Sequence, residues 1–356
     1  MYSLEDLGWG PYFQQQTEQP NSEGLAPMRV AEEQRGAYVL WGPRGGLDAV
    51  IPGRMLHESR GRDDLPAVGD WVLARPLPGE PRAVVERLLT RRSSLSRKAA
   101  GERTDEQIMA ANVDLVIVVA SLNSELNLRR LERYLAVTWE SGARPVLVLN
   151  KSDLCAAHDE LSRRVELIAP GVEVIQTSAV TGDGVEAVRA LLSRGVTAVF
   201  VGSSGVGKSS IINRLLDREA QVVSHIRADD KGRHTTTARQ MLVVPDGGVI
   251  IDTPGLRELQ LWDAGEGLGQ VFAEVEELVQ QCAFNDCGHR AEPGCAVQAA
   301  LEAGALDLGR WESYRKLQRE QIFIESKKDN RLRIEQTKKW KQIHKANRQR
   351  MKLRGR

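Results

Sequence analysis

Residues 196–216, VTAVFVGSSGVGKSSIINRLL, limit the possible folds of this chain more than any other stretch. The apolar beginning, residues 196–201, is typical of a buried strand, and Ile211, Ile212 and Leu215 recur at helical spacing. Between them, residues 202–209 fill every fixed position of G-x-x-x-x-G-K-[ST], the phosphate-binding loop pattern. A glycine-rich turn that happens to precede a helix is the alternative, but it does not require eight residues in register.

This loop predicts a binding site for nucleotide phosphates. Glycines let successive backbone N–H groups turn toward phosphate oxygens, and the helix N-terminus adds positive potential. Lys208 would reach the β- and γ-phosphates, and the Ser209 hydroxyl would ligate Mg²⁺. The predicted nucleotide-binding residues of the loop are Gly202, Ser203, Ser204, Gly205, Val206, Gly207, Lys208, Ser209 and Ser210.

From residue 113 onward, continuous apolar segments alternate with amphipathic ones. Strands are predicted over 113–120, 145–149, 172–176 and 196–201, and helices near 128–142, 161–168 and 184–192. A hairpin is predicted from 241–244 and 249–251. This alternation predicts a mostly parallel sheet with helices on both faces.

Polar loops follow four of the predicted strands, at 150–153 (NKSD), 177–179 (TSA), 202–209 and 252–255 (DTPG). The carboxyl ends of parallel strands lie along one edge of a sheet, where ligands bind. We therefore expect the four loops to meet in one nucleotide site.

Two further segments suit magnesium and the γ-phosphate. Asp252 can hold Mg²⁺ through water opposite Ser209, and the backbone N–H of Gly255 can approach the γ-phosphate closely. A threonine of the 232–237 run (GRHTTT), Thr236 or alternatively Thr235, could complete the Mg²⁺ shell only while a γ-phosphate is present, which would make the run a switch.

The NKSD loop favours guanine. The Asp153 carboxylate can accept hydrogen bonds from both guanine N1–H and the N2 amino group, which adenine lacks in that arrangement. Asn150 can bond N7 or hold the neighbouring loop, and the Lys151 stem can lie across the base. NKSD alone also caps helices in many chains, but here it follows a strand. The predicted base-recognition residues are Asn150, Lys151, Ser152, Asp153, Ser178 and Ala179.

Three of the four cysteines lie within 14 residues, with a histidine among them, which indicates a metal site in a reducing compartment rather than disulfides. Three thiolates and one imidazole suffice for a closed tetrahedral Zn²⁺ site, so one structural zinc is expected to hold together a small module that lacks its own core. Cys155 stands apart, as a small filler near a loop. The predicted ligands are Cys282, Cys287, His289 and Cys295.

Charge is distributed unevenly along the chain. Residues 326–356 carry 13 Lys and Arg against 2 acidic residues, while the other residues sum to −10. A solvated helix would mix signs, so this basic tail, which includes Trp340, indicates a polyanionic partner such as RNA. No apolar run of 18 residues and no signal-peptide pattern occurs, which predicts a cytoplasmic protein with no membrane association.

The residues before 99 do not show the alternation of apolar and amphipathic segments. Residues 1–28 show no sustained period and are expected to form a flexible N-terminal arm. Short predicted strands at 37–41, 47–51, 70–74 and 83–85 are typical of a small antiparallel barrel resembling the OB fold. Such a barrel could bind oligonucleotides or serve only as a packing domain, and the sequence leaves both open.

Together, the loops at 150–153, 178–179, 202–210, 232–237 and 252–255 match the GTPase motif set, with the base loop placed before the phosphate loop. This rotated order resembles the circularly permuted GTPases of the RsgA (YjeQ) family over about residues 30–325. The chain is expected to divide into a flexible arm (1–28), an OB-like barrel (29–98), a permuted α/β P-loop GTPase domain (99–270), a zinc-binding helical module (271–325) and a basic tail (326–356), and the resemblance covers the middle three. The resemblance also places the family's zinc ligands on the four residues named above.

In function, the resemblance implies a monomeric GTP hydrolase that is stimulated by the small ribosomal subunit, binds its rRNA and acts late in assembly beside other assembly factors. Leu256 stands where Ras-like enzymes have a glutamine that positions water. The resemblance offers His234 as the substitute, although His234 could merely shape the switch, and it makes Lys208 and Gly255 the other catalytic groups. A GTP-gated RNA-binding scaffold with little hydrolysis is the alternative, and a small-molecule kinase is disfavoured because no acceptor-binding segment is evident.

The rotated order also predicts coupling between domains. The 252–255 loop leads into an acidic helix near 274–278 and then into the cysteine cluster. We therefore expect that a movement of Gly255, dependent on the γ-phosphate, is transmitted to the C-terminal module. The bound nucleotide would then control how tightly the flanking domains bind RNA.

Overall fold

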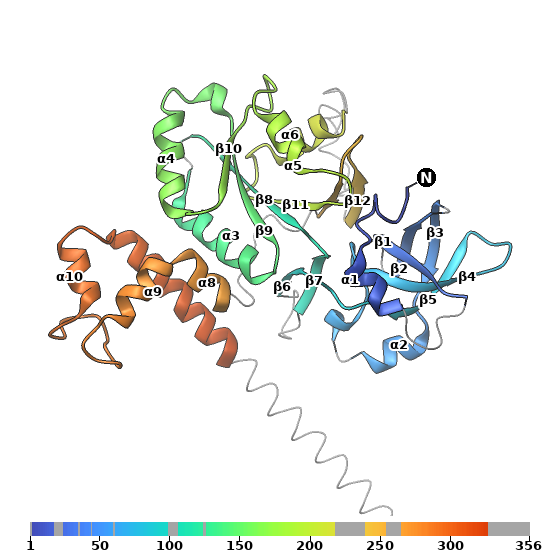
Figure 1. The fold of residues 1–356 in the computed structure, drawn as a ribbon, viewed down its shortest axis with the longest axis horizontal. Coiled ribbons are helices and arrows are strands. Elements are labelled where there is room, and N and C mark those ends of the chain that lie inside the picture. Colours follow the sequence, from blue (N-terminus) through green and yellow to red (C-terminus); the bar gives the residue numbers. More distant parts are fainter. Residues whose placement is uncertain are drawn as a thin grey trace, which may run out of the picture.

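The structure is a computed structural model that describes residues 2–17, 24–34, 36–43, 45–59, 61–98, 106–123, 126–217, 239–253 and 265–326. Three regions follow one another across the molecule: a barrel, a central α/β region and a group of C-terminal helices (Figure 1). In this part of the chain no helix combines the length and apolar character needed to cross a membrane.

The central region alternates strands and helices as predicted. Its strands are β8 (Leu115–Ser121), β9 (Arg144–Asn150), β10 (Glu173–Gln176), β11 (Thr197–Val201), β12 (Arg239–Val243) and β13 (Val249–Asp252). Its helices are α3 (Leu128–Glu140), α4 (His158–Ile168), α5 (Val185–Leu191) and α6 (Lys208–Leu215), with a 3₁₀ turn, η3 (Ser152–Leu154). Strands pair in parallel in the order β10-β9-β8-β11-β13, and β12 pairs antiparallel with β13. The predicted parallel sheet and hairpin are therefore confirmed.

Both faces of this sheet are buried, which explains why its strands are continuously apolar. Along β8, Val116 and Val118 pack in the core that includes Leu131 of α3. The alternate residues Ile117 and Val119 pack on the other face, in the core that includes residues of α5 and α6. Because side chains alternate along a strand, a strand covered on both faces has no polar side.

The N-terminal region is a closed five-stranded barrel. Its elements are β1 (Ala26–Gln34), β2 (Ala37–Gly42), β3 (Gly45–Val50), α2 (Gly53–Glu58), η2 (Arg62–Asp64), β4 (Trp71–Pro76) and β5 (Arg82–Leu88). Strands neighbour one another in the order β1-β2-β3-β5-β4, and β1 also pairs with β4, which closes the ring. The barrel that the sequence predicted is thereby confirmed, with β1 added to the four predicted strands.

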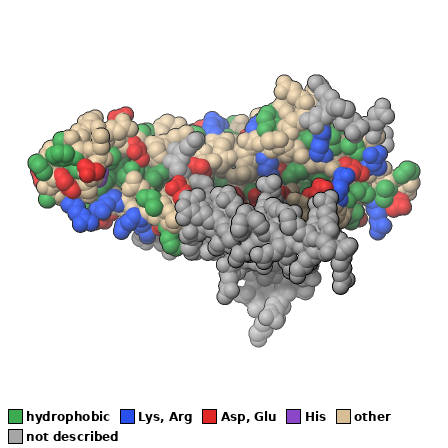
Figure 2. Space-filling view, turned by 90° about the horizontal axis from the view of Figure 1, so that it is seen from below, with side chains coloured by type: hydrophobic (Ala, Val, Ile, Leu, Met, Phe, Trp, Pro, Cys, Tyr) green, Lys and Arg blue, Asp and Glu red, His purple; other side chains and the backbone are tan. Residues whose placement is uncertain are grey.

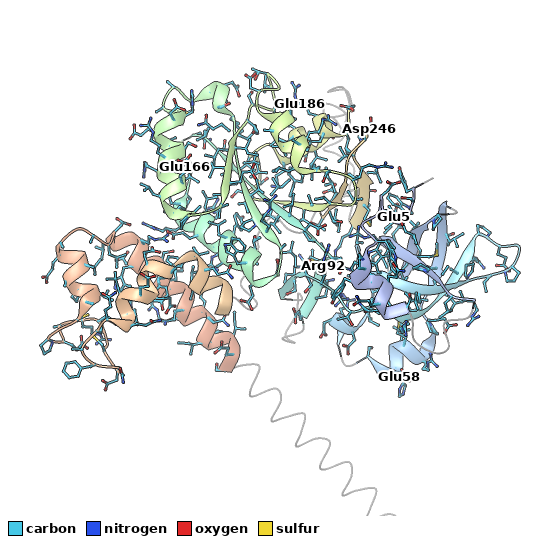
Figure 3. All side chains as sticks on the ribbon, viewed as in Figure 1. Glu5, Glu58, Arg92, Glu166, Glu186 and Asp246 are labelled. Atoms are coloured by element: carbon cyan, nitrogen blue, oxygen red, sulfur yellow. The ribbon has the colours of Figure 1, made fainter. Side chains whose placement is uncertain are left out.

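Two connections join the barrel to the central region. β1 pairs with β12, where Glu33 forms an ion pair with Arg239 at 3.1 Å, so that one eleven-stranded sheet passes through both regions. A ribbon of β6 (Ser94–Lys98) and β7 (Glu106–Ala111) forms the second connection, and Arg92 lies beside it (Figure 3). The division proposed at residue 98 thus falls between two paired strands.

Buried Arg29 ties three segments together at this junction. Its guanidinium donates to the carbonyl oxygens of Leu7, Gly69 and Asn112, which belong to the N-terminal segment, the barrel and the entry to β8. Burial lowers the pKa of Arg29 to about 10, because it disfavours the charged form. Three carbonyl acceptors offset much of that cost, and they link the three segments in addition to the strand pairing.

The expectation that residues 1–28 form a flexible arm is wrong for the described residues. Residues 2–17 include α1 (Pro11–Gln14) and the 3₁₀ turn η1 (Gln15–Thr17). Leu7 and Phe13 are 0% and 1% exposed, and the rings of Trp9 and Phe13 lie 4.8 and 5.8 Å from that of Trp71. These aromatic residues show no helical or strand period in the sequence, because their positions are set by contact with Trp71, on a strand far along the chain.

The C-terminal region contains α8 (Gly265–Val271), α9 (Ala273–Gln280), α10 (Ala296–Glu302) and a helix over 308–326. Its buried residues, including Phe272, Trp311 and Tyr314, join the core that contains Leu131 and Leu135 of α3. The module therefore has buried apolar packing in addition to the predicted metal site, and it shares this core with α3. α8 also crosses the division proposed at residue 270, and the five-part division of the chain remains a proposal.

We predict that Phe13→Ala lowers the free energy of unfolding by about 3 kcal/mol, because it leaves a cavity against Trp71. Tyr12→Ala is the matched control, since Tyr12 is 41% exposed. Urea unfolding followed through tryptophan fluorescence compares the two variants. Equal and small losses would show that the N-terminal segment is not docked on the barrel.

Candidate nucleotide site and metal cluster

The loop between β11 and α6 has the backbone conformation that its glycines permit. Gly202, Gly205 and Gly207 have φ angles of 138°, 80° and 100°. A Cβ at Gly202 would lie 2.2 Å from the carbonyl oxygen of Val119, and one at Gly207 would lie 2.1 Å from Nδ2 of Asn150. Gly202 and Gly207, the first and last glycines of the motif, are therefore required for two reasons. Their φ angles are positive, and a side chain at either position would collide with a neighbouring atom.

Lys208 begins α6, and its side chain folds back over the loop. Its ammonium donates to the carbonyl oxygens of Gly202 and Ser203 at 2.7 and 2.6 Å. Ser204, Gly205 and Ser209 are exposed. The ammonium group thus lies within the loop, hydrogen-bonded to carbonyl oxygens of the loop backbone. Phosphate oxygens of a bound nucleotide can compete with these carbonyls for it.

Asn150 connects the base loop to the phosphate loop. The residue ends β9 and is 1% exposed. Its Nδ2 donates to the carbonyl oxygen of Val206 at 2.8 Å, and its Oδ1 accepts from the backbone N–H of Ala179 at 3.0 Å and the hydroxyl of Thr177 at 3.2 Å. Of the two roles left open for Asn150, the structure shows the contact with neighbouring loops.

The rest of the base loop is shaped by local hydrogen bonds. Lys151 adopts a left-handed conformation with φ of 66°, which is uncommon for a residue with a side chain, and Asp153 is exposed in η3. The Ser152 N–H donates to the carbonyl oxygen of Thr177 at 3.1 Å. Ser178 is fully buried, and its hydroxyl accepts from the Thr181 N–H at 3.1 Å. Its side chain therefore shapes the loop rather than reaching outward.

The sequence did not predict one contact, which joins helix α6 to the 178–182 loop. Arg214, near the end of α6, donates to the carbonyl oxygens of Ala179 and Val180. An arginine on an exposed helix face gives no sequence signal for such a contact, because only the sheet order places α6 beside the 178–182 loop.

Asp252 ends β13, which pairs in parallel with β11 in a register that aligns Val199 with Ile251. Asp252 therefore lies at the same edge as the phosphate loop. Four other sequence predictions fall outside the described residues: His234, Thr236 with its alternative Thr235, and Gly255.

The structure brings together the four predicted metal ligands. Their ligand atoms all lie within 4.8 Å of one another. Nδ1 of His289 is 3.5 Å from Sγ of Cys282 and 3.6 Å from Sγ of Cys295, and these two sulfurs are 4.0 Å apart. A tetrahedral ion with bonds of about 2.3 Å to sulfur and about 2.0 Å to nitrogen needs separations of about 3.5 to 3.8 Å. The cluster could therefore hold one metal ion.

Neighbouring groups hold these ligands in place. Sγ of Cys295 accepts from the backbone N–H of Gln298 at 3.4 Å, so that the thiol caps α10. The Gln298 side chain donates to the carbonyl oxygen of His289 at 2.8 Å, and the Trp311 ring lies edge-on at 5.4 Å from the imidazole. Such outer contacts orient metal ligands. Cys155 follows η3 in the central region and takes no part in the cluster.

Residues 88–262 match the family model described as RsgA GTPase. The chain is 45% identical to the small ribosomal subunit biogenesis GTPase RsgA of Opitutus terrae, over 99% of both chains. It is 46% identical to RsgA 1 of Oceanobacillus iheyensis, over 88% of this chain and 90% of that one.

Solved structures show the same architecture. YjeQ from Thermotoga maritima is 28% identical and superposes with a TM-score of 0.63, over 84% of this chain and 99% of that one. YloQ, described as a circularly permuted GTPase, superposes with a TM-score of 0.60 at 21% identity, over 86% of this chain and 98% of that one, which supports the fold alone.

The sheet order and the loops at its carboxyl edge define a P-loop GTPase in which the base loop precedes the phosphate loop along the chain. Because identity to curated relatives extends over nearly the whole length, the chain belongs to the RsgA GTPase family. It is therefore a GTP-hydrolysing enzyme.

We predict that the purified chain carries about one metal ion, as a closed four-ligand cluster should. Cys282→Ala should lose most of it, whereas Cys155→Ala should keep it, because Cys155 lies outside the cluster. Elemental analysis after desalting measures both. Equal metal content in the two variants would contradict the assignment.

Proposed function

We propose that this chain hydrolyses GTP at the carboxyl edge of its parallel sheet and acts as a late maturation factor of the small ribosomal subunit, which stimulates the hydrolysis. The observation that carries the proposal is the buried Asn150 amide, which holds the base loop and the phosphate loop together. One nucleotide can therefore contact both. The relatives from Opitutus terrae and Oceanobacillus iheyensis are small ribosomal subunit biogenesis GTPases, which supports a role in the maturation of that subunit.

In the proposed reaction, water attacks the γ-phosphorus and the bond to the β–γ bridging oxygen breaks, which releases GDP and inorganic phosphate, the latter taking up the oxygen and protons of the water. Lys208 and the N–H groups of the phosphate loop stabilise the charge that spreads over the phosphate oxygens. Ser209, Thr236 and Asp252 would hold Mg²⁺, which neutralises charge on the β- and γ-phosphates. His234 would position the water, and the N–H of Gly255 would contact the γ-phosphate. Asp153 and Lys151 would read guanine.

For the metal cluster we propose Zn²⁺ in a structural role. Three thiolates and one imidazole are a donor set that zinc prefers, and a shell closed by four protein ligands leaves no position for a substrate. Cys282, Cys287, His289 and Cys295 would be its ligands.

We infer that the small subunit's rRNA binds the chain partly through the helix over 308–326. Arg315, Lys316 and Arg319 line a hollow of about 470 Å³ on this helix together with Trp311, and the Arg315 guanidinium lies 5.7 Å from the Trp311 ring. Basic side chains gather at this end of the molecule (Figure 2). Clustered cations suit RNA phosphates, and Trp311, which is 4% exposed, supports Arg315 from the core. The basic tail of 326–356 would add to this surface, and the chain would act as a cytoplasmic monomer beside other assembly factors.

The alternative is a GTP-gated RNA-binding scaffold with little hydrolysis. We predict that purified small subunits raise the rate of phosphate release on the order of tenfold or more, because they complete the arrangement around the γ-phosphate. Large subunits and bare RNA are the controls. A rate that small subunits leave unchanged would favour the scaffold.

We predict that Asp153→Asn weakens GTP binding by about 100-fold and improves xanthosine triphosphate binding, since an amide cannot accept from both N1–H and the N2 amino group of guanine. Asp246→Asn, the same change in the exposed turn between β12 and β13, is the matched control. Competition against a fluorescent guanine nucleotide measures both affinities. Unchanged GTP affinity in Asp153→Asn would refute the base-loop assignment.

A further inference from the structure

Helix α3 contacts two parts of the molecule. Its Arg130 reaches the phosphate loop, and neighbouring residues of the helix reach the C-terminal region. Arg130 donates to the hydroxyl of Ser203, the residue that follows the first glycine of the loop. Arg129 donates to Glu132 at 2.6 Å and also to Asp307. The sequence predicted only an amphipathic helix here, and neither arginine belongs to a GTPase motif.

The N-terminal turn of α3 is fixed by its cap. The Asn127 side chain accepts a hydrogen bond from the backbone N–H of Arg130 at 3.1 Å. This bond fixes the backbone at the start of the helix and at Arg130. Ser203 itself carries two positively charged partners, because its carbonyl oxygen accepts from the Lys208 ammonium at 2.6 Å while its hydroxyl accepts from Arg130. The first turn of the phosphate loop is thus held between two cations.

The contacts of α3 with the C-terminal helices are more deeply buried. Glu132 is fully buried and accepts from Arg310 at 3.0 Å as well as from Arg129. Arg310 also donates to Glu274 of α9 and to the carbonyl oxygen of Val271, at 2.7 Å, and lies 4.7 Å from the Phe272 ring. The next residue of α3, Arg133, forms a separate pair with the helix over 308–326.

That separate pair joins Arg133 to Glu320 through two hydrogen bonds of 2.7 and 2.9 Å. Residues 129, 132 and 133 share one face of α3, because positions three and four apart are neighbours on a helix. Residue 130 is rotated by about 100° from residue 129, toward the phosphate loop. A helix moves as one body, so a shift of the C-terminal helices against α3 must move Arg130.

We propose that Arg130 is a positioning residue for the phosphate loop, and that the C-terminal helices set its position through α3. It acts on the bound nucleotide through Ser203 and through its charge, which lies beside the predicted phosphate site. This inference rests on the proposed function, since it assumes that the loop holds GTP. It differs from the coupling predicted through Gly255, because every residue in it belongs to α3, the phosphate loop or the C-terminal helices.

The first test uses full-length chains with Arg130→Ala, Ser203→Ala or both. We expect Arg130→Ala to raise the KM for GTP about tenfold, as the loss of one hydrogen bond and one nearby charge should, with kcat changed less than about twofold. The double variant should be no worse than Arg130→Ala, because both changes remove the same contact. Arg130→Lys, which keeps the charge, should recover part of the affinity.

Arg163→Ala, at an exposed arginine of α4, is the matched control and should leave KM unchanged. A purely structural role for Arg130 would reduce the active fraction and lower kcat at constant KM, which would overturn the proposal. So would additive losses in the double variant.

The second test addresses the C-terminal helices. Glu320→Gln removes the charge and one of the two acceptors that Arg133 uses, at a partly exposed position, and should raise KM two- to threefold, as one weak pair allows. The same change made in the Arg130→Ala chain should have no further effect on KM. An equal effect of Glu320→Gln in both backgrounds would show that α3 does not link the two sites.

Lys208→Ala separates this inference from the proposed function. If Lys208→Ala abolishes GTP binding while Arg130→Ala behaves like Arg163→Ala, the loop holds GTP and the role of Arg130 is wrong. If Lys208→Ala leaves GTP binding intact, the nucleotide site itself is misassigned.

Discussion

The buried amide of Asn150 is the contact on which the proposed nucleotide site depends. A side-chain amide at 1% exposure has to find partners for both of its ends, since a buried polar group without one costs about 1–3 kcal/mol. Its partners lie on two other loops: the carbonyl oxygen of Val206, and the N–H of Ala179 with the hydroxyl of Thr177. Satisfying one side chain therefore fixes the separation between the base loop and the phosphate loop. Gly207 completes the arrangement, because any larger residue would collide with the same amide.

The parallel sheet explains why a permuted chain can still build this site. Loops meet because their strands are neighbours in space, and the order of the strands along the chain does not matter. Permutation changes what is attached to the sheet. The barrel joins through β1 beside β12, and buried Arg29 links it to the entry of β8. The C-terminal helices pack on α3, which follows β8. Both flanking regions therefore contact the central region: the barrel at β12, which pairs with β13, and the C-terminal helices at α3, whose Arg130 contacts the phosphate loop.

Sequence patterns predicted the strands and loops at this sheet edge well and their long-range contacts poorly, while the binding roles of the loop residues stay predictions. The glycines of the phosphate loop, the NKSD tetrapeptide and the cysteine cluster are recognisable because their chemistry requires fixed spacing. The parallel strands are recognisable because burial on both faces leaves no polar position. Arg29, Arg130 and Arg214 were not predicted, since an arginine that reaches a distant carbonyl or hydroxyl has no period in the sequence. The docking of Phe13 on Trp71 was missed for the same reason, and a short apolar segment among glutamines was misinterpreted as a flexible arm.

The strength of the link through α3 depends on which of its ion pairs is buried. Arg129 and Asp307 are 37% and 67% exposed, and pairs in water contribute about 0–1 kcal/mol. Glu132 and Arg310 are 0% and 9% exposed, and breaking such a pair costs about 3–5 kcal/mol, because it leaves a buried charge unpaired. Within the described residues, Oε2 of Glu132 has no hydrogen-bond partner, so the buried carboxylate relies on the two arginines at Oε1. The buried pair therefore keeps α9 and the 308–326 helix on α3, while the exposed pairs can exchange partners at little cost.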